Sequence, residues 1–259
     1  MMPLDVPIAI LLIGAMGGYL GGIVGAGIGA IVVPGLVLIG IDPKVAIGSS
    51  LLLHVFIGPL GGISHYRLGH VRWRIFSSLA LAGMMGAFLG AAVSTHLPGE
   101  ELTMIVGIST AVAGLSILAN STRHSNTPRV LTYLNGKLQK VRLSPIALIG
   151  FTAGISHGAL GTGWGPIGVP LLILAGVVPH VAVGSSLLAR TLVALVGGST
   201  YYAFYTIQSN VVLPLLAGGS IAILLGALTA KKLSPKLLKL IVGIVAIVLG
   251  SLVIIKWVL

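Results

Sequence analysis

Long apolar runs separated by short polar ones extend over almost the whole chain. Five of them, at about 6–24, 30–41, 45–65, 75–95 and 102–119, precede a polar, basic stretch at 120–142. Five more follow it, at about 144–161, 166–178, 181–203, 211–230 and 238–257. A membrane-spanning helix needs about 20 apolar residues, so most of these runs predict spans. The short runs at 30–41 and 166–178 predict half-helices or re-entrant arms instead.

Composition supports a membrane protein. Of the 259 residues, 56% are hydrophobic and 7% are charged, whereas a soluble domain is typically about 25% charged. With 15 Lys+Arg and 4 Asp+Glu, the chain cannot cover a water-facing surface, which excludes a soluble enzyme and a nucleic-acid-binding module. The absence of cysteine excludes a disulfide scaffold. The 38 glycines fit closely packed membrane helices, and the expected fold class is an all-α polytopic membrane protein.

Motifs of the first half recur in the second at one constant offset of 136 residues. The recurring pairs are 25–29 with 161–165, Pro34 with Pro170, Pro43 with Pro179, and 46–52 with 182–188. The register predicts a first repeat at 1–119, a linker at 120–142 and a second repeat at 143–259. Each repeat has about five segments and begins with a hairpin broken by glycine and proline.

The charged loops indicate that the two repeats are inverted. The loop that holds Arg67, Arg72 and Arg74 corresponds to the uncharged loop 203–210, and the acidic loop around Glu100 corresponds to a loop with four lysines at 231–239. Basic loops of membrane proteins face the cytoplasm, so equivalent loops lie on opposite sides. We expect the linker 120–142 to be cytoplasmic and both termini to lie outside a cell (inner) membrane.

Inverted repeats with interrupted segments at matching positions are typical of secondary transporters, whose site lies near the midplane at the repeat interface. The doubled motif supplies more detail. Its first copy is Gly18-x-x-x-Gly22-x-x-Gly25-x-Gly27-x-Gly29 with Pro34 and Gly48-Ser49-Ser50-Leu51, and its second copy is Gly154-x-x-x-Gly158-x-x-Gly161-x-Gly163-x-Gly165 with Pro170 and Gly184-Ser185-Ser186-Leu187. This pattern resembles the TauE/SafE sulfite exporter family of the TSUP group. The resemblance implies a membrane transporter of small sulfur anions such as sulfite or sulfonates. The form that we expect from this resemblance is Gly-Thr-Ser-Leu. Both copies here read Gly-Ser-Ser-Leu, and the serine in place of threonine keeps the side-chain hydroxyl.

Arg190 is the basic residue that the topology does not explain. It lies about ten residues into its segment, which places it about 15 Å deep, near the middle of a core of about 30 Å. A cation there costs at least ~2.5 kcal/mol unless it is paired. The four acids (Asp5, Asp42, Glu100 and Glu101) lie near segment ends, so an anionic substrate is the natural counter-ion. The alternative is that Arg190 bonds to backbone carbonyls at a helix break.

Further candidates for substrate binding surround this position. His54, which corresponds to Arg190 in the first repeat, and His157 can bind an anion or carry a coupling proton; either can instead be a neutral ring bonded to the backbone. The glycines of the tips, Gly25, Gly27, Gly161 and Gly163, expose N–H groups that attract anions, or serve only close packing.

The remaining candidates for substrate binding are Ser49, Ser50, Ser185, Ser186, Thr162 and Trp164. Serines in membrane helices commonly bond back to their own helix, and Trp164 can be a packed aromatic. Tyr201, Tyr202 and Tyr205 are interpreted as an interfacial aromatic belt.

An enzyme finds little support, because the chain has no evident carboxylate pair, cysteine nucleophile or metal-ligand cluster. We expect no cofactor, no metal and no nucleic-acid partner. The expected function is secondary transport of a small anion by alternating access, with the lipid bilayer as environment. Two alternatives stay open: a passive channel for small anions or neutral solutes, and a non-transporting membrane subunit. A homodimer through glycine-rich faces also stays open.

Overall fold

The structure is a computed structural model that describes residues 5–24, 28–122, 143–162, 164–205, 208–230 and 235–259. Within these ranges the regular structure is entirely α-helical. The helices are α1 (Asp5–Val24), α2 (Gly29–Leu38), α3 (Pro43–Arg67), α4 (Trp73–His96), α5 (Gly99–Thr122), α6 (Leu143–Leu160), α7 (Trp164–Leu174), α8 (Pro179–Phe204), α9 (Ser209–Ala230) and α10 (Pro235–Val258). Every predicted run corresponds to one of these helices, with ends that agree within four residues.

Eight of the described helices are long and apolar enough to cross a membrane, namely α1, α3, α4, α5, α6, α8, α9 and α10. The other two, α2 and α7, have 10 and 11 residues, or about 15–17 Å at 1.5 Å per residue. That length covers about half of a hydrocarbon core. The predicted all-α polytopic membrane class is therefore confirmed, and the two short runs are half-length helices.

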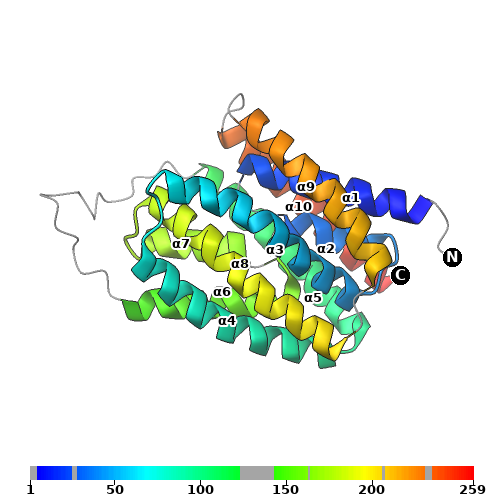
Figure 1. Cartoon of the computed structure of the whole chain (residues 1–259). Helices are drawn as coiled ribbons and strands as arrows, with labels where there is room; N and C mark the ends of the chain where they lie inside the picture. Colours follow the sequence, from blue (N-terminus) through cyan, green and yellow to red (C-terminus); the bar gives the residue numbers. More distant parts are fainter. Residues whose placement is uncertain (1–4, 25–27, 123–142, 163, 206–207, 231–234) are drawn as a thin grey trace, which may run out of the picture.

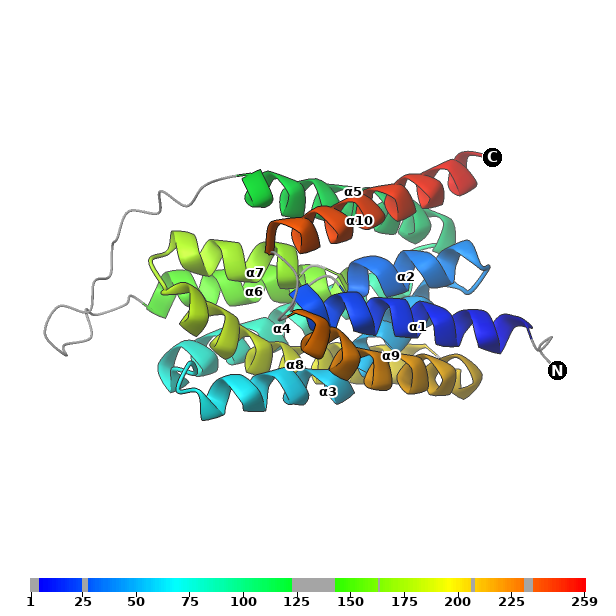
Figure 2. The same cartoon turned by 90° about the horizontal axis from the view of Figure 1, so that it is seen from above.

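The two short helices belong to hairpins that enter the bundle from opposite ends. The start of α1 and the end of α10 lie at one end, while the ends of α5 and α6 that adjoin the linker lie at the other (Figure 1). The α1–α2 hairpin returns to the first end and the α6–α7 hairpin to the second, with their tips near the middle (Figure 2). The tips touch, because a β-carbon on Gly29 would overlap the carbonyl oxygen of Gly161.

Backbone contacts repeat at the same offset of 136 residues as the sequence motifs. In the α1–α9 pair, Gly18 faces the carbonyl of Gly219, and in the α6–α4 pair Gly154 faces the carbonyl of Gly83. A β-carbon at either Gly18 or Gly154 would collide with the backbone of the neighbouring helix. Glycine is therefore what allows these two helix pairs to approach so closely.

The two half-helices differ in their surroundings. Nine of the ten residues of α2 are buried, from Gly29 to Val37. In α7, three of eleven are buried: Trp164, Gly168 and Leu172. Helix α2 lies against α1, α3, α5 and α10, whereas α7 packs mainly on α6 and α8. The order of long and short helices is therefore the same before and after the linker, whereas the two short helices differ in how they are covered.

Candidate functional site

The candidate site lies where the hairpin tips meet the central helices α3 and α8. Helix α3 contributes Ser49, Ser50 and His54, and each of these side chains is buried. His157 comes from the last turn of α6, which ends at Leu160 and is followed by Gly161 with a left-handed φ of 68°. The Gly161 N–H donates to the carbonyl of His157 at 2.7 Å, so the turn that forms the tip also fixes the backbone of His157.

The two histidines contact each other directly. The ring centroids of His54 and His157 are 5.0 Å apart, and the rings meet edge to face at 86°. Nδ1 of His54 lies 2.7 Å from the carbonyl oxygen of Ser50. Because a carbonyl only accepts, Nδ1 carries the hydrogen and Nε2 of a neutral His54 is left as an acceptor. Neither ring nitrogen of His157 has a hydrogen-bond partner among the described residues, so this ring is free to bond a substrate.

Arg190 lies at the middle of α8 and is 5% exposed. Its Nε has no hydrogen-bond partner in the described part of the chain, and its positive charge acts on both His54 and His157. The hydroxyl oxygens of Ser49 and Ser50 are also buried without a partner there. An unsatisfied buried polar group costs about 1–3 kcal/mol, and more if it is charged. The cluster therefore contains a positive charge and donors that none of the described protein groups satisfies.

Helices α7 and α8 add a fixed polar contact. Trp164, at the start of α7, donates its indole N–H to the Ser186 hydroxyl at 2.7 Å, and its ring lies 6.2 Å from that of His157. Thr162 is buried at the tip, with its Cα close to Gly29. The tryptophan thus joins the tip of the second hairpin to α8 beside the histidine pair.

The structure does not gather all of the predicted residues at one place. Ser185 accepts a hydrogen bond from the backbone N–H of Arg72 at 3.1 Å, and it lies toward the end of the bundle where α4 begins. Gly25, Gly27 and Gly163 lie outside the described residues. The residues that these interactions bring together are His54, His157, Arg190, Ser50, Ser186, Gly161, Thr162 and Trp164, and Ser49 is buried next to Ser50 on α3. Together they form a buried, mainly polar group that includes one cation and no carboxylate.

Comparison with known proteins agrees with this architecture. The family model for the sulfite exporter TauE/SafE matches residues 10–253. The chain belongs to the TauE/SafE sulfite exporter family. It is 30% identical over 246 residues to a probable membrane transporter protein of Xylella fastidiosa (strain Temecula1), covering 93% of this chain and 92% of that protein. It is also 30% identical over 260 residues to the probable membrane transporter protein YunE of Bacillus subtilis (strain 168), covering 94% and 95%. No solved structure matches the chain.

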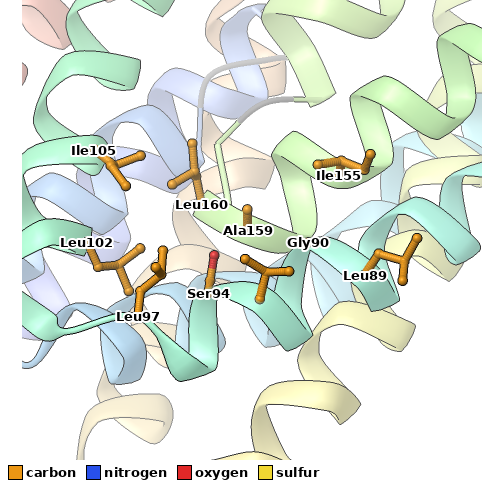
Figure 3. Close-up of a pocket in the computed structure, with 10 residues that line it drawn as sticks. Leu89, Gly90, Ser94, Leu97, Leu102, Ile105, Ile155, Ala159 and Leu160 are labelled. Carbon is orange, nitrogen blue, oxygen red and sulfur yellow. The ribbon is translucent and has the colours of Figure 1, made fainter.

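The protein is thus a membrane transporter of the TauE/SafE family, and its described part also contains an apolar cleft. The cleft, of about 290 Å³, lies between α4, α5 and α6 (Figure 3). Its walls are formed by Leu89, Gly90, Val93, Ser94, Leu97, Leu102, Ile105, Ile155, Ala159 and Leu160. Leu160 immediately precedes Gly161, but the polar cluster does not line the cleft. The cleft is therefore distinct from the candidate site in this TauE/SafE transporter.

Two residues have structural roles that the sequence did not indicate. Tyr201 is fully buried and its hydroxyl donates to the Ala159 carbonyl at 3.1 Å, so its assignment to an aromatic belt is wrong. The signal was present in the spacing, because Gly197 and Ala194 place small residues on the same helix face. Lys256 donates to the carbonyls of Val37 and Leu38 at 3.0 and 3.1 Å, and it caps the C-terminus of α2.

Proposed function

We propose that this TauE/SafE transporter moves a small anion, sulfite or an organosulfonate, and that the anion binds between His54, His157 and Arg190. The observation that carries this proposal is the environment of Arg190. It is a buried cation at mid-helix, and all four acidic residues of the chain lie at the starts of α1, α3 and α5. A substrate that brings its own negative charge would supply the missing counter-ion.

The chemistry of the cluster favours an oxyanion over a halide. A guanidinium presents its N–H groups as a planar fork that pairs with two oxygens of one ligand. The hydroxyls of Ser49 and Ser50 can donate to a further oxygen, and neither has a described partner that competes for it. Sulfite and sulfonates each offer three oxygens on one sulfur, which suits donors that converge from α3, α6 and α8.

Alternating access at this site would follow from the arrangement of the hairpins. The tips meet near the middle of the bundle, with α2 and α7 reaching the two opposite ends (Figure 2). Arg67, Arg72 and Arg74 gather at the end that adjoins the linker, which supports a cytoplasmic position for that end. Rocking of one repeat against the other would then expose the anion to each side in turn.

Anion binding to purified protein tests the proposal. We expect sulfite or methanesulfonate to raise the unfolding temperature of the wild-type protein, and we expect Arg190→Gln to weaken that binding at least thirtyfold. Loss of one partner from a buried charge pair costs ~2 kcal/mol or more, which gives this factor. The matched control is Arg74→Gln, which removes the same charge from an exposed position in the first turn of α4. Equal affinity of folded Arg190→Gln and wild-type protein would contradict the proposed site.

Flux through reconstituted protein separates a carrier from a channel. We expect uptake of labelled sulfite or sulfonate into vesicles to saturate with substrate concentration, and unlabelled anion on the far side to accelerate it by exchange. A flux that rises linearly with substrate concentration, and that does not change when unlabelled anion is added on the far side, would instead support a passive channel.

A further inference from the structure

Three described helices end in the same type of glycine turn. Helices α2, α3 and α7 are followed by Gly40, Gly69 and Gly176, with φ values of 91°, 71° and 86°. In each case the N–H of the glycine and that of the next residue bond back to carbonyls of the last helical turn. This is the Schellman motif, which places the residue after the glycine beside the helical residue whose carbonyl it bonds.

At two of the three turns this side-by-side pair is apolar, as is usual for the motif. The pair is Leu36 with Ile41 after α2, and Leu172 with Val177 after α7, and all four side chains are buried. At the end of α3 the equivalent residues are His65 and His70. Their Nδ1 atoms are 3.2 Å apart, which is hydrogen-bonding distance. Two imidazoles therefore occupy positions where the other two turns have aliphatic side chains.

The histidine pair also contacts the second repeat. The ring of His70 lies 4.8 Å from that of His180, in the first turn of α8. The His70 carbonyl lies against Gly184, and the backbone N–H of Arg72 donates to the hydroxyl of Ser185. These contacts tie the turn between α3 and α4 to the start of α8, at the end of the bundle that adjoins the linker (Figure 1). We call His65, His70 and His180 the histidine latch.

The charges around the latch are all positive among the described residues. Arg67 ends α3, Arg72 precedes α4, and Arg74 lies in the first turn of α4. The acidic residues lie at the starts of α1, α3 and α5, which are at the opposite end of the bundle (Figure 2). His180 lies at the N-terminus of α8, where the helix dipole disfavours a further positive charge. Nothing described near the latch offers a negative charge to a protonated imidazole.

Protonation removes the bond that holds the pair together. The Nδ1–Nδ1 hydrogen bond needs one ring to donate and the other to accept. When both rings are protonated, both Nδ1 atoms carry a hydrogen, neither can accept, and two like charges face each other. Imidazole is the side chain that normally changes charge between about pH 5 and pH 8. Protonation of His70 and His180 also places two positive rings against each other, because their centroids are 4.8 Å apart, so acidification weakens the contact between the α3–α4 turn and α8.

We propose that the histidine latch is a pH-sensitive closure of the linker-side entrance, shut when the imidazoles are neutral and released when they are protonated. This inference rests on the proposed alternating access, in which that entrance must open. The direction of the pH response follows from the repulsion between protonated imidazoles. The open state binds more protons than the shut state, so lower pH on that side favours opening. Transport in the direction that needs linker-side opening would then respond to the pH of that compartment.

A distance measurement tests the latch without any substrate. The chain contains no cysteine, so Leu68→Cys with Pro179→Cys places two spin labels specifically, one on each side of the latch, in protein embedded in lipid nanodiscs. At pH 8 we expect one short distance. At pH 5.5 we expect the ratio of long to short distances to rise about tenfold, the change produced by tenfold tighter binding of one proton in the open state.

The matched control replaces the histidine pair with the aliphatic pair of the α2 turn. His65→Leu with His70→Ile should keep the short distance at both pH values, because it removes the titrating groups and restores apolar packing. His180→Phe keeps a ring at its position and should reduce the response. A wild-type distance that is unchanged between pH 8 and pH 5.5, or an equal response in the double variant, would overturn the latch. A pH-dependent distance in protein that binds no anion would instead overturn the proposed function alone.

Discussion

At the scale of single residues, the site depends on contacts between side chains that are distant in sequence. His54 lies on α3 and His157 on α6, on opposite sides of the linker in sequence, and Trp164 reaches Ser186 across the α7–α8 turn. The depth of Arg190 could be predicted from its place in an apolar run, because only length and hydrophobicity decide it. The pairing of His54 with His157 could not, since it requires the tips of both hairpins to be placed in three dimensions.

The Trp164–Ser186 hydrogen bond gives a prediction at this scale. Trp164→Phe keeps an aromatic ring but removes the indole N–H, so the buried Ser186 hydroxyl loses its donor. We expect a loss of stability of about 1–3 kcal/mol, measured by thermal or denaturant unfolding in detergent. Adding Ser186→Ala to Trp164→Phe should cost little more, because the bond is already lost. Fully additive effects in this double-mutant cycle would show that the two side chains do not interact.

At the scale of helices, the positions and lengths of the apolar runs predicted every described element, and glycine spacing determines how the elements pack. What the pattern could not give is which face of a wholly apolar helix is buried, because lipid-facing and protein-facing positions are equally apolar. Tyr201 illustrates this: it was assigned to an interfacial belt, whereas it is buried beside the end of α6. Its neighbour Tyr202 is 74% exposed.

Repeat-related glycines give a prediction at the element scale. Gly18→Val and Gly154→Val each place a branched side chain against the backbone of the partner helix. We expect both to destabilise the protein by about 1–3 kcal/mol or to prevent folding, as monitored by monodisperse yield and unfolding temperature. Thr152→Val, at an exposed position on α6, is the control and should leave both unchanged. A normal yield and unfolding temperature for Gly154→Val would contradict the close α4–α6 packing.

At the scale of the whole molecule, the constant offset of 136 residues predicted two related halves, and the described glycine contacts repeat at that offset. The orientation of those halves in a membrane is argued from charge. The described arginines of the α3–α4 turn gather at one end and the acidic residues at the other. The unequal burial of α2 and α7 could not be predicted from the sequence. It arises because α5 and α10 pack against α2 more than against α7.

Labelling of intact cells tests the proposed orientation. Single cysteines at Glu100 and Leu68 lie at opposite ends of the bundle, in a chain that has no cysteine of its own. A membrane-impermeant thiol reagent added outside should label Glu100→Cys at once and Leu68→Cys only after the membrane is permeabilised. The reverse pattern would place the linker outside and overturn the proposed orientation of the chain in the membrane.

The unequal covering of the two half-helices has a consequence for how the sequence can drift. A position in α2 such as Val33 or Leu36 is enclosed on every side, so a change of volume there must be absorbed by several neighbouring helices. On α7, Leu171 and Leu174 are 37% and 76% exposed, so they can exchange among apolar residues without disturbing a packed neighbour. We therefore expect α2 to tolerate fewer substitutions than α7, although the two short helices occupy matching places in the order of the helices.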